Sequence, residues 1–164
     1  MLDSSRLMDK FFQYYRFKKA RPFLIGDVFD FGGNRGELKR YVKGRYLAIN
    51  YDHSDMENVH FDTIACLAVI EHLHAPEVLA VFHEFKSILN KGGRIILTTP
   101  TRAAKPILEF MAWLGIIDQA NLAEHKHYWN EKEIRALAEK SGLAIKKYKK
   151  FQLGFNQLAV FEHK

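Results

Sequence analysis

Cysteine is nearly absent from this chain of 164 residues, and long apolar runs, internal repeats and low-complexity tracts are absent altogether. The single cysteine, Cys66, excludes an intramolecular disulfide and fits a reducing compartment, so we expect a cytoplasmic protein. No uninterrupted apolar segment approaches the roughly 20 residues that a membrane-spanning helix needs. Charged side chains at Asp3, Arg6 and Asp9 argue against a secretory signal at the amino terminus.

Basic residues are in excess: 25 lysines and arginines stand against 19 acidic residues, which gives a net charge of +6. Much of this excess lies in two short clusters, residues 16–21 and 146–150. Such clusters are usually solvated faces of a helix or an edge strand. The alternative is contact with nucleic acid or another anionic surface. We therefore expect a small-molecule partner, with nucleic acid as the less favoured one.

Strand and helix patterns alternate along most of the chain, which is typical of βαβ units and a parallel sheet. We predict an α/β fold: a three-layer αβα sandwich with a Rossmann-like, mostly parallel sheet and a terminal antiparallel hairpin. It forms a single domain over residues 1–164, with a leading helix (1–21) and a core (22–164). The expected helices are 3–18, 37–42, 76–91, 106–117 and 131–141, and the expected strands are 28–31, 45–51, 61–67, 94–99, 143–151 and 157–162.

The most informative stretch is Val28-Phe29-Asp30-Phe31-Gly32-Gly33-Asn34-Arg35-Gly36, an apolar run that ends in an acid and a glycine-rich turn before a helical pattern. Glycines let the backbone approach a ligand, and a helix amino terminus offers unpaired N–H groups, so the turn predicts a site for a nucleotide-type cofactor. Asn34 replaces an expected glycine, but asparagine accepts a left-handed backbone, and we expect the turn to survive. Asn50, or Asp52 two residues on, would accept hydrogen bonds from a ribose.

Two further segments make this pattern specific. Phe61-Asp62-Thr63-Ile64 leads to Glu71-His72-Leu73, and Lys91-Gly92-Gly93 opens a strand that ends in Thr98-Thr99-Pro100. With these segments the chain resembles the class I S-adenosylmethionine-dependent methyltransferases, in particular the small-molecule branch that includes ubiquinone-biosynthesis-type enzymes. The resemblance covers roughly residues 25 to 162. The span between Tyr51 and Phe61 is too short for the usual helix and extra strand, so we expect a compact version that lacks them.

The resemblance implies S-adenosylmethionine as the cofactor and indicates which residues bind it. These are Asp30, Gly32, Gly33, Asn34 and Gly36 for its methionine and ribose parts, Asn50 or Asp52 for the ribose hydroxyls, Asp55 for the adenine amino group, and the backbone of Leu67 and Ala68 for the methionine amino end.

Glu71 and His72 admit two interpretations. Structurally, Glu71 caps or orders the loop after its strand and His72 packs under it. Functionally, His72 is a general base, because the unperturbed pKa of histidine lies near neutrality, and His125 is a second candidate. Some relatives bind a divalent metal through an E-x-x-E-H arrangement and a distant histidine. Here Ala68 takes the place of the first acid, so we expect no metal.

The run from Ile107 to Ile117 is more apolar than one core-facing side requires. It would roof an apolar acceptor pocket, form a homodimer contact or touch a membrane surface, in that order of preference. Taken with the resemblance, the sequence predicts transfer of the cofactor's methyl group to a small-molecule acceptor, apolar or lipid-linked acceptors included. The alternatives are a methyltransferase-like fold without catalysis that serves as a binding module, and a nucleic-acid methyltransferase.

Overall fold

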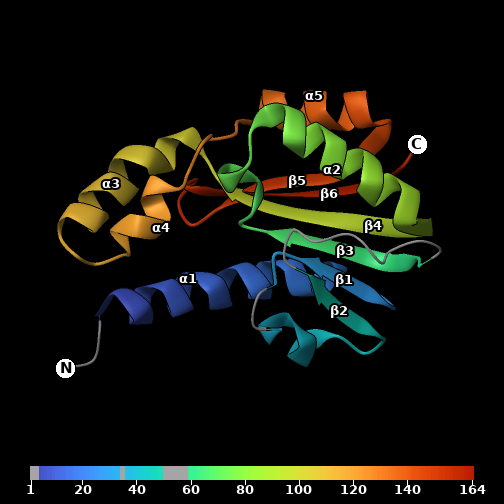
Figure 1. Cartoon of the computed structure of the whole chain (residues 1–164), viewed down its shortest axis with the longest axis horizontal. Coiled ribbons are helices and arrows are strands. Elements are labelled where there is room, and N and C mark those ends of the chain that lie inside the picture. Colours follow the sequence, from blue (N-terminus) through green and yellow to red (C-terminus); the bar gives the residue numbers. More distant parts are fainter. Residues whose placement is uncertain (1–3, 34–35, 50–58) are drawn as a thin grey trace.

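One six-stranded sheet, in the order β2-β1-β3-β4-β6-β5, organises the computed structural model, which describes residues 4–33, 36–49 and 59–164 (Figure 1). The first four strands are parallel, whereas β6 runs antiparallel to both of its neighbours. The predicted α/β fold with its terminal antiparallel hairpin is therefore confirmed. The strands are β1 (Val28–Phe31), β2 (Tyr46–Ile49), β3 (Phe61–Leu67), β4 (Leu89–Pro100), β5 (Leu143–Phe151) and β6 (Asn156–His163).

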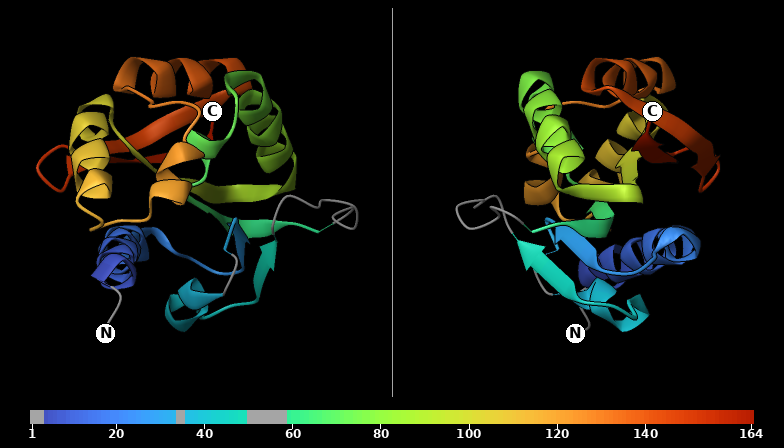
Figure 2. Two further views of the ribbon diagram at one scale, coloured as in Figure 1. Left: turned by 60° about the vertical axis from the view of Figure 1, so that its left-hand side comes forward. Right: turned by 90° about the vertical axis from the view of Figure 1, so that its right-hand side faces the viewer.

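Helices cover both faces of this sheet (Figures 1 and 2). Helices α2 and α5 lie on one face, where a continuous cluster of buried side chains includes Phe29, Phe82 and Phe161. Helix α1 and the 3-10 turn η2 lie on the other face, over two smaller clusters. None of the helices in the described residues is long and apolar enough to cross a membrane. The helical elements are α1 (Ser4–Ala20), η1 (Arg21–Phe23), η2 (Glu37–Tyr41), η3 (Ile70–His72), α2 (Ala75–Ile88), η4 (Arg102–Ala104), α3 (Lys105–Trp113), α4 (Gln119–Ala123) and α5 (Glu131–Ser141).

Local signals place the ends of α2 and α5. Pro76 lies in the first turn of α2, where its missing N–H costs nothing, and the His74 N–H is accepted by the Glu77 carboxylate at 2.7 Å. Asn130 and Glu133 form a reciprocal capping box at the start of α5. Gly142 ends that helix with φ +68°, a left-handed conformation that glycine adopts without strain.

Three predicted boundaries were wrong. Helix α2 ends at Ile88, because Leu89 already pairs with Phe61 of β3, and Gly92-Gly93 lies inside β4. The predicted helix at 37–42 is only the 3-10 turn η2, which buries the single side chain of Leu38. The predicted helix at 106–117 is shorter, because α3 ends at Trp113, and the short helix α4, which begins at Gln119, was not predicted.

The compact edge of the sheet is seen only in part. Among the described residues β2 is the edge strand, and it ends at Ile49. Residues 50–58, where the sequence predicts that a helix and a strand are missing, lie outside the described residues. That prediction therefore stays a prediction.

Candidate active site

A cavity of about 1060 Å³ opens at the carboxyl ends of β1, β3 and β4. This is the edge at which ligands bind in open α/β sheets. Helix α1 borders it on one side, and α3 and α4 border it on another. The sequence-predicted site residues that line it are Asp30, Gly32, Gly33, Leu67, Ala68, His72 and His125. Gly36 does not line it, and Asn34, Asn50, Asp52 and Asp55 lie outside the described residues, so their roles stay predictions.

The glycine-rich turn after β1 admits no side chains at its first two positions. At Gly32, which has φ +83°, an added Cβ would lie 2.6 Å from Val69 Cγ2. At Gly33 an added Cβ would overlap the carboxylate of Asp30. The Gly36 N–H donates to the Gly33 carbonyl at 2.8 Å and closes the turn. The backbone of the turn therefore reaches the cavity wall with no side chain in the way.

Asp30 brings a carboxylate to this wall. It is buried, and the Tyr46 hydroxyl donates a hydrogen bond to its Oδ2. Burial raises the pKa of Asp30 to about 6, against the opposing effect of the Tyr46 hydrogen bond. At neutral pH the group is mainly ionised and accepts hydrogen bonds.

Ala68, directly after β3, has φ +59°, which is rare for a residue other than glycine. Its N–H donates to the Thr98 carbonyl at 2.8 Å, which holds the chain where β3 ends. A bound amino group donates hydrogen bonds, so the backbone groups of this loop that would accept them are carbonyl oxygens. Unusual backbone of this kind is concentrated at binding sites.

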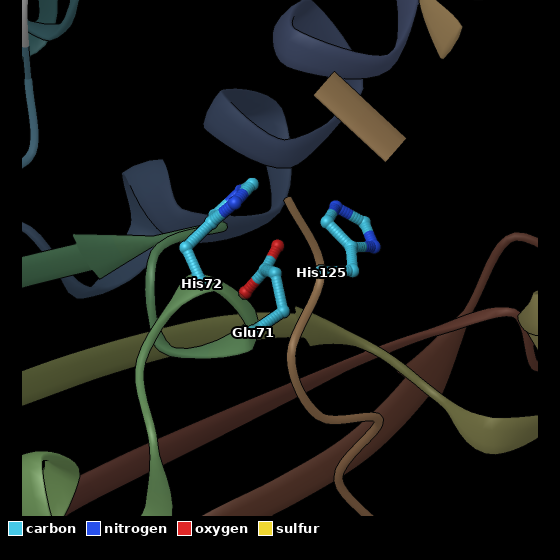
Figure 3. Close-up of side chains that lie close together, drawn as sticks. All are labelled: Glu71, His72 and His125. Carbon is cyan, nitrogen blue, oxygen red and sulfur yellow. The ribbon is translucent and has the colours of Figure 1, made fainter. Parts of the chain in front are cut away.

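Glu71, His72 and His125 meet at the cavity floor, although 53 positions separate the last two (Figure 3). Glu71 and His72 lie in η3, and His125 lies in the segment before α5. The Glu71 carbonyl accepts from the Lys126 N–H at 2.7 Å, which ties the two segments together. The imidazole rings of His72 and His125 stand edge to face with their centroids 4.8 Å apart.

Burial sets the protonation of these three groups. It raises the pKa of Glu71 to about 7, against a 3.0 Å hydrogen bond donated by Thr99 Oγ1 and the positive charge of Arg16. It lowers the pKa of His72, and together with His72 and Arg16 it lowers the pKa of His125 to about 4. Both imidazoles are therefore neutral near pH 7. His72 Nδ1 is buried without a hydrogen-bond partner among the described residues, and it lies 4.0 Å from the exposed Glu124 carboxylate.

One carboxylate and two imidazoles are also the ligand set of some catalytic metal centres. Here the donor atoms are spread over up to 4.8 Å. Two ligands on one ion, each about 2.1 Å from it, lie at most about 4.2 Å apart. The side chains would have to close in, and the Arg16 charge next to Glu71 opposes a cation. The prediction that the site holds no metal stays a prediction.

Sequence reasoning missed Arg16, which lines the cavity from α1. In the part of the chain that the structure describes, its Nε is buried without a hydrogen-bond partner, and burial lowers the pKa of the guanidinium despite the nearby charges of Glu71 and Asp9. A buried donor with no partner indicates a missing acceptor. The signal was present in the basic cluster at 16–21, but nothing in the sequence distinguished Arg16 from its solvated neighbours.

The apolar run at 107–117 does line the cavity. Leu108 and Met111 of α3 form part of the wall with Ile117, and Leu122 of α4 continues it. The other side of α3 carries Phe110 and Trp113 in solvent. Helix α3 therefore presents apolar side chains both to the cavity and to solvent.

Comparison with known proteins identifies the family. A family model described as a methyltransferase domain matches residues 5–148. A search of curated proteins finds no match. Among solved structures, the SAH-bound form of CalO1, a methyltransferase in calicheamicin biosynthesis, is 13% identical with a TM-score of 0.69, over 96% of this chain and 55% of that one.

Two further solved structures show the same fold. RosA from Streptomyces davawensis, an N,N-8-amino-8-demethyl-D-riboflavin dimethyltransferase, is 12% identical with a TM-score of 0.67, over 93% of this chain and 55% of that one. The PH0226 protein from Pyrococcus horikoshii OT3 is 16% identical with a TM-score of 0.65, over 93% of this chain and 91% of that one.

The chain spans about half the length of CalO1 and RosA. Identities this low show the fold alone, whereas the family model covers most of the sequence. The sequence-predicted family, fold and cofactor class are therefore confirmed, and the branch within the family stays a prediction. The chain belongs to the methyltransferase-domain family and has the fold of the class I S-adenosylmethionine-dependent methyltransferases.

Proposed function

We propose that this chain transfers the methyl group of S-adenosylmethionine to a small-molecule acceptor, with apolar and lipid-linked acceptors included. One observation carries the proposal. A single cavity joins the glycine-rich turn after β1 to the Glu71–His72–His125 cluster, under the apolar wall of α3 and α4. Such a cavity provides for a cofactor at one end and an acceptor at the other.

The residues present fit the parts of the cofactor. The turn at Gly32 and Gly33 and the carboxylate of Asp30 would receive its methionine and ribose parts, and carbonyls near Leu67 and Ala68 would accept from its amino group. Arg16 lines the cavity, and its Nε has no hydrogen-bond partner among the described residues. Its guanidinium would pair with the carboxylate of the methionine part. When bound, the cofactor supplies an electrophilic methyl group, so the protein needs no nucleophile of its own.

The protein's part in the reaction is to orient the acceptor, exclude water and receive a proton. A hydroxyl or amine acceptor would lose its proton when it is methylated. His72 lines the cavity, and its Nδ1 has no partner within the described ranges, so it would take this proton. Beside it Glu71, with a pKa of about 7, is matched to hold a proton at neutral pH, whereas His125 is the weaker base because its pKa is about 4.

Calorimetric titration with S-adenosylmethionine and its demethylated product tests the first half of the proposal. We expect saturable binding with one site per chain. No heat of binding at millimolar cofactor would overturn the proposal. Asp30→Asn should weaken binding, whereas Asp118→Asn, a carboxylate on another wall of the same cavity, should leave it unchanged.

The second half is tested with a labelled methyl donor and a panel of phenols, quinols and amines of increasing chain length. Label in the acceptor, lost in His72→Ala while cofactor affinity is kept, supports catalysis at this site. Cofactor binding with no transfer to any acceptor would favour the binding-module alternative instead.

A further inference from the structure

Most of the exposed apolar side chains lie on segments that border the cavity. The large hydrophobic side chains that are exposed in the described residues are mostly in three segments: α1, α3 with the turn that follows it, and the β5–β6 turn. The same three segments also supply lining residues of the cavity. We call these side chains the apolar rim: Phe11, Tyr14, Ile107, Phe110, Trp113, Leu114 and Leu153.

The rim is strongly exposed. Trp113 is 73% exposed and Phe110 57%, and their rings stack with centroids 5.9 Å apart in solvent. Leu153 is 95% exposed at the tip of the β5–β6 turn, where it has φ +56°. Exposed apolar side chains gathered in this way, on segments that border a cavity, mark an interaction surface.

The two basic clusters of the sequence come together beside this rim. Lys147 and Lys149 of β5 each lie 5.5 Å from the ring of Phe23, and Lys19 lies 5.1 Å from the ring of Tyr15. Tyr15 stacks on Phe151, next to the β5–β6 turn, with ring centroids 6.0 Å apart. We call Lys19, Lys147 and Lys149 the basic patch.

The surroundings of the basic patch are poor in acid. Helix α1 and strand β5 together contain nine basic residues and one acidic residue. The excess of basic over acidic residues in these two elements is larger than the net charge of +6 of the whole chain. Burial and the neighbouring charges of Lys19 and Lys147 lower the pKa of Lys149. Like charges held this close favour an anionic partner.

We propose that the apolar rim and the basic patch dock the cavity mouth onto a lipid bilayer that contains anionic lipid. Aromatic side chains such as Trp113 and Phe110 enter the headgroup region, and the lysines contact lipid phosphates. A second copy of the chain fits this surface less well, because the basic segments of the two copies would repel each other. The docking rests on the exposed groups alone, whereas entry of a long-chain acceptor from the bilayer rests on the proposed function.

The full chain carries its own reporter for this docking. It has two tryptophans, and Trp129 is only 4% exposed, so the emission of Trp113 responds to a change of solvent. We expect a blue shift on addition of vesicles of phosphatidylcholine and phosphatidylglycerol, with sedimentation of the protein together with the vesicles. Vesicles of phosphatidylcholine alone should bind about tenfold less, and added salt should weaken binding to the anionic ones.

Matched variants test which surface binds. Phe110→Ser with Trp113→Ser should lower the fraction that sediments about tenfold, and Lys147→Glu with Lys149→Glu should do the same. Leu47→Ser on β2 and Lys91→Glu at the amino end of β4, both exposed and away from the cavity, should bind like the unmodified protein.

Three results would overturn the docking proposal: no sedimentation with anionic vesicles, equal losses in the control variants, or light scattering that shows a dimer which Phe110→Ser with Trp113→Ser separates. Titration of the same preparations with S-adenosylmethionine keeps the two proposals apart. Cofactor binding without vesicle binding ends the docking proposal alone, whereas vesicle binding without cofactor binding ends the proposed function alone.

Discussion

Aromatic rings are packed out of water under α2 and α5, whereas the helices that border the cavity leave aromatic rings in solvent. Phe29 and Phe82 in the first region are fully buried, but Phe11 and Tyr14 on α1 and Phe110 on α3 are each more than half exposed. Burial of apolar surface is the main source of stability. The first region therefore contributes most to the stability of the fold, whereas the second leaves apolar surface free for contacts with a partner.

Removal of one aromatic ring from each region tests this comparison, and we expect it to give the largest difference in the free energy of unfolding. Phe82, with Phe85 and Phe161 at ring-centroid distances of 5.5 and 5.1 Å, has no exposed surface. We expect Phe82→Ala to lower the free energy of unfolding by about 3–5 kcal/mol. Tyr15→Ala on α1 should cost only about 1–2 kcal/mol, because Tyr15 is partly buried. Urea denaturation measures both, and equal losses would contradict the comparison.

Buried ionisable groups at the cavity should make stability depend on pH. The pKa of Glu71 is raised from 4.5 to about 7. The folded chain therefore holds this proton more tightly than the unfolded chain, and stability falls as pH rises from about 4.5 to 7, by up to about 3 kcal/mol.

Glu71→Gln should remove this fall in stability. Denaturation of the unmodified protein and of the variant at each pH gives the difference in their free energies of unfolding, which isolates the contribution of Glu71. The lowered pKa values of His72 and His125 act in the opposite direction, because the unfolded chain binds those protons first and stability is lost as pH falls below about 6.5. A difference curve that is flat across the window would show that Glu71 is not buried as described.

Arg16 should separate binding from stability. Loss of a charge-assisted hydrogen bond costs about 1.5–3 kcal/mol, so Arg16→Met should weaken S-adenosylmethionine binding about 10–100-fold in calorimetry. Removal of the guanidinium should change the free energy of unfolding little, because the cost of burying this group, whose Nε has no partner among the described residues, offsets its attraction to Glu71 and Asp9. Lys18→Met, exposed on the same helix, is the control. A large loss of stability with unchanged affinity would assign Arg16 to the fold instead.

The smallest expected difference compares two helix caps. Asn130→Ala removes the cap of α5, in the packed region, and should cost about 1 kcal/mol. Asp118 Oδ1 accepts from the Ala120 N–H at the start of α4, beside the cavity. Asp118→Ala should cost less than about 0.5 kcal/mol, because this short, exposed helix contributes little to global unfolding. Thermal denaturation of the two variants measures their losses of stability. Equal losses would show that α4 unfolds together with the core.

Local chemistry made much of the fold predictable. The capping box of Asn130 and Glu133, Gly142 after α5 and Pro76 in α2 each act within a few residues, so the sequence shows them directly. The end of α2 was missed because Leu89 is taken from the helix by pairing with Phe61, a partner 28 positions away. The glycine-rich turn was predictable for the same reason as the caps, since Gly33 meets the side chain of Asp30 three residues away, whereas the contact of Gly32 with Val69 depends on the fold.

At the cavity floor, too, some features were predictable from the sequence and others were not. His72 and His125 were each recognised in the sequence, but contacts between their two segments, such as the Lys126 N–H donating to the Glu71 carbonyl, bring them together. Arg16 was hidden in a basic cluster, because its difference from Lys18 and Lys19 is burial, which depends on what lies opposite.

The sequence by itself determined the order of strands and helices, the glycine-rich turn and the family, because these follow from apolar periodicity, turn chemistry and short motifs. Only the tertiary structure decided that Arg16 lies near Glu71, that the two basic clusters adjoin, and that the exposed aromatic rings lie on segments that border one cavity. Each of these depends on which distant segments pack together, and packing is a property of the whole chain.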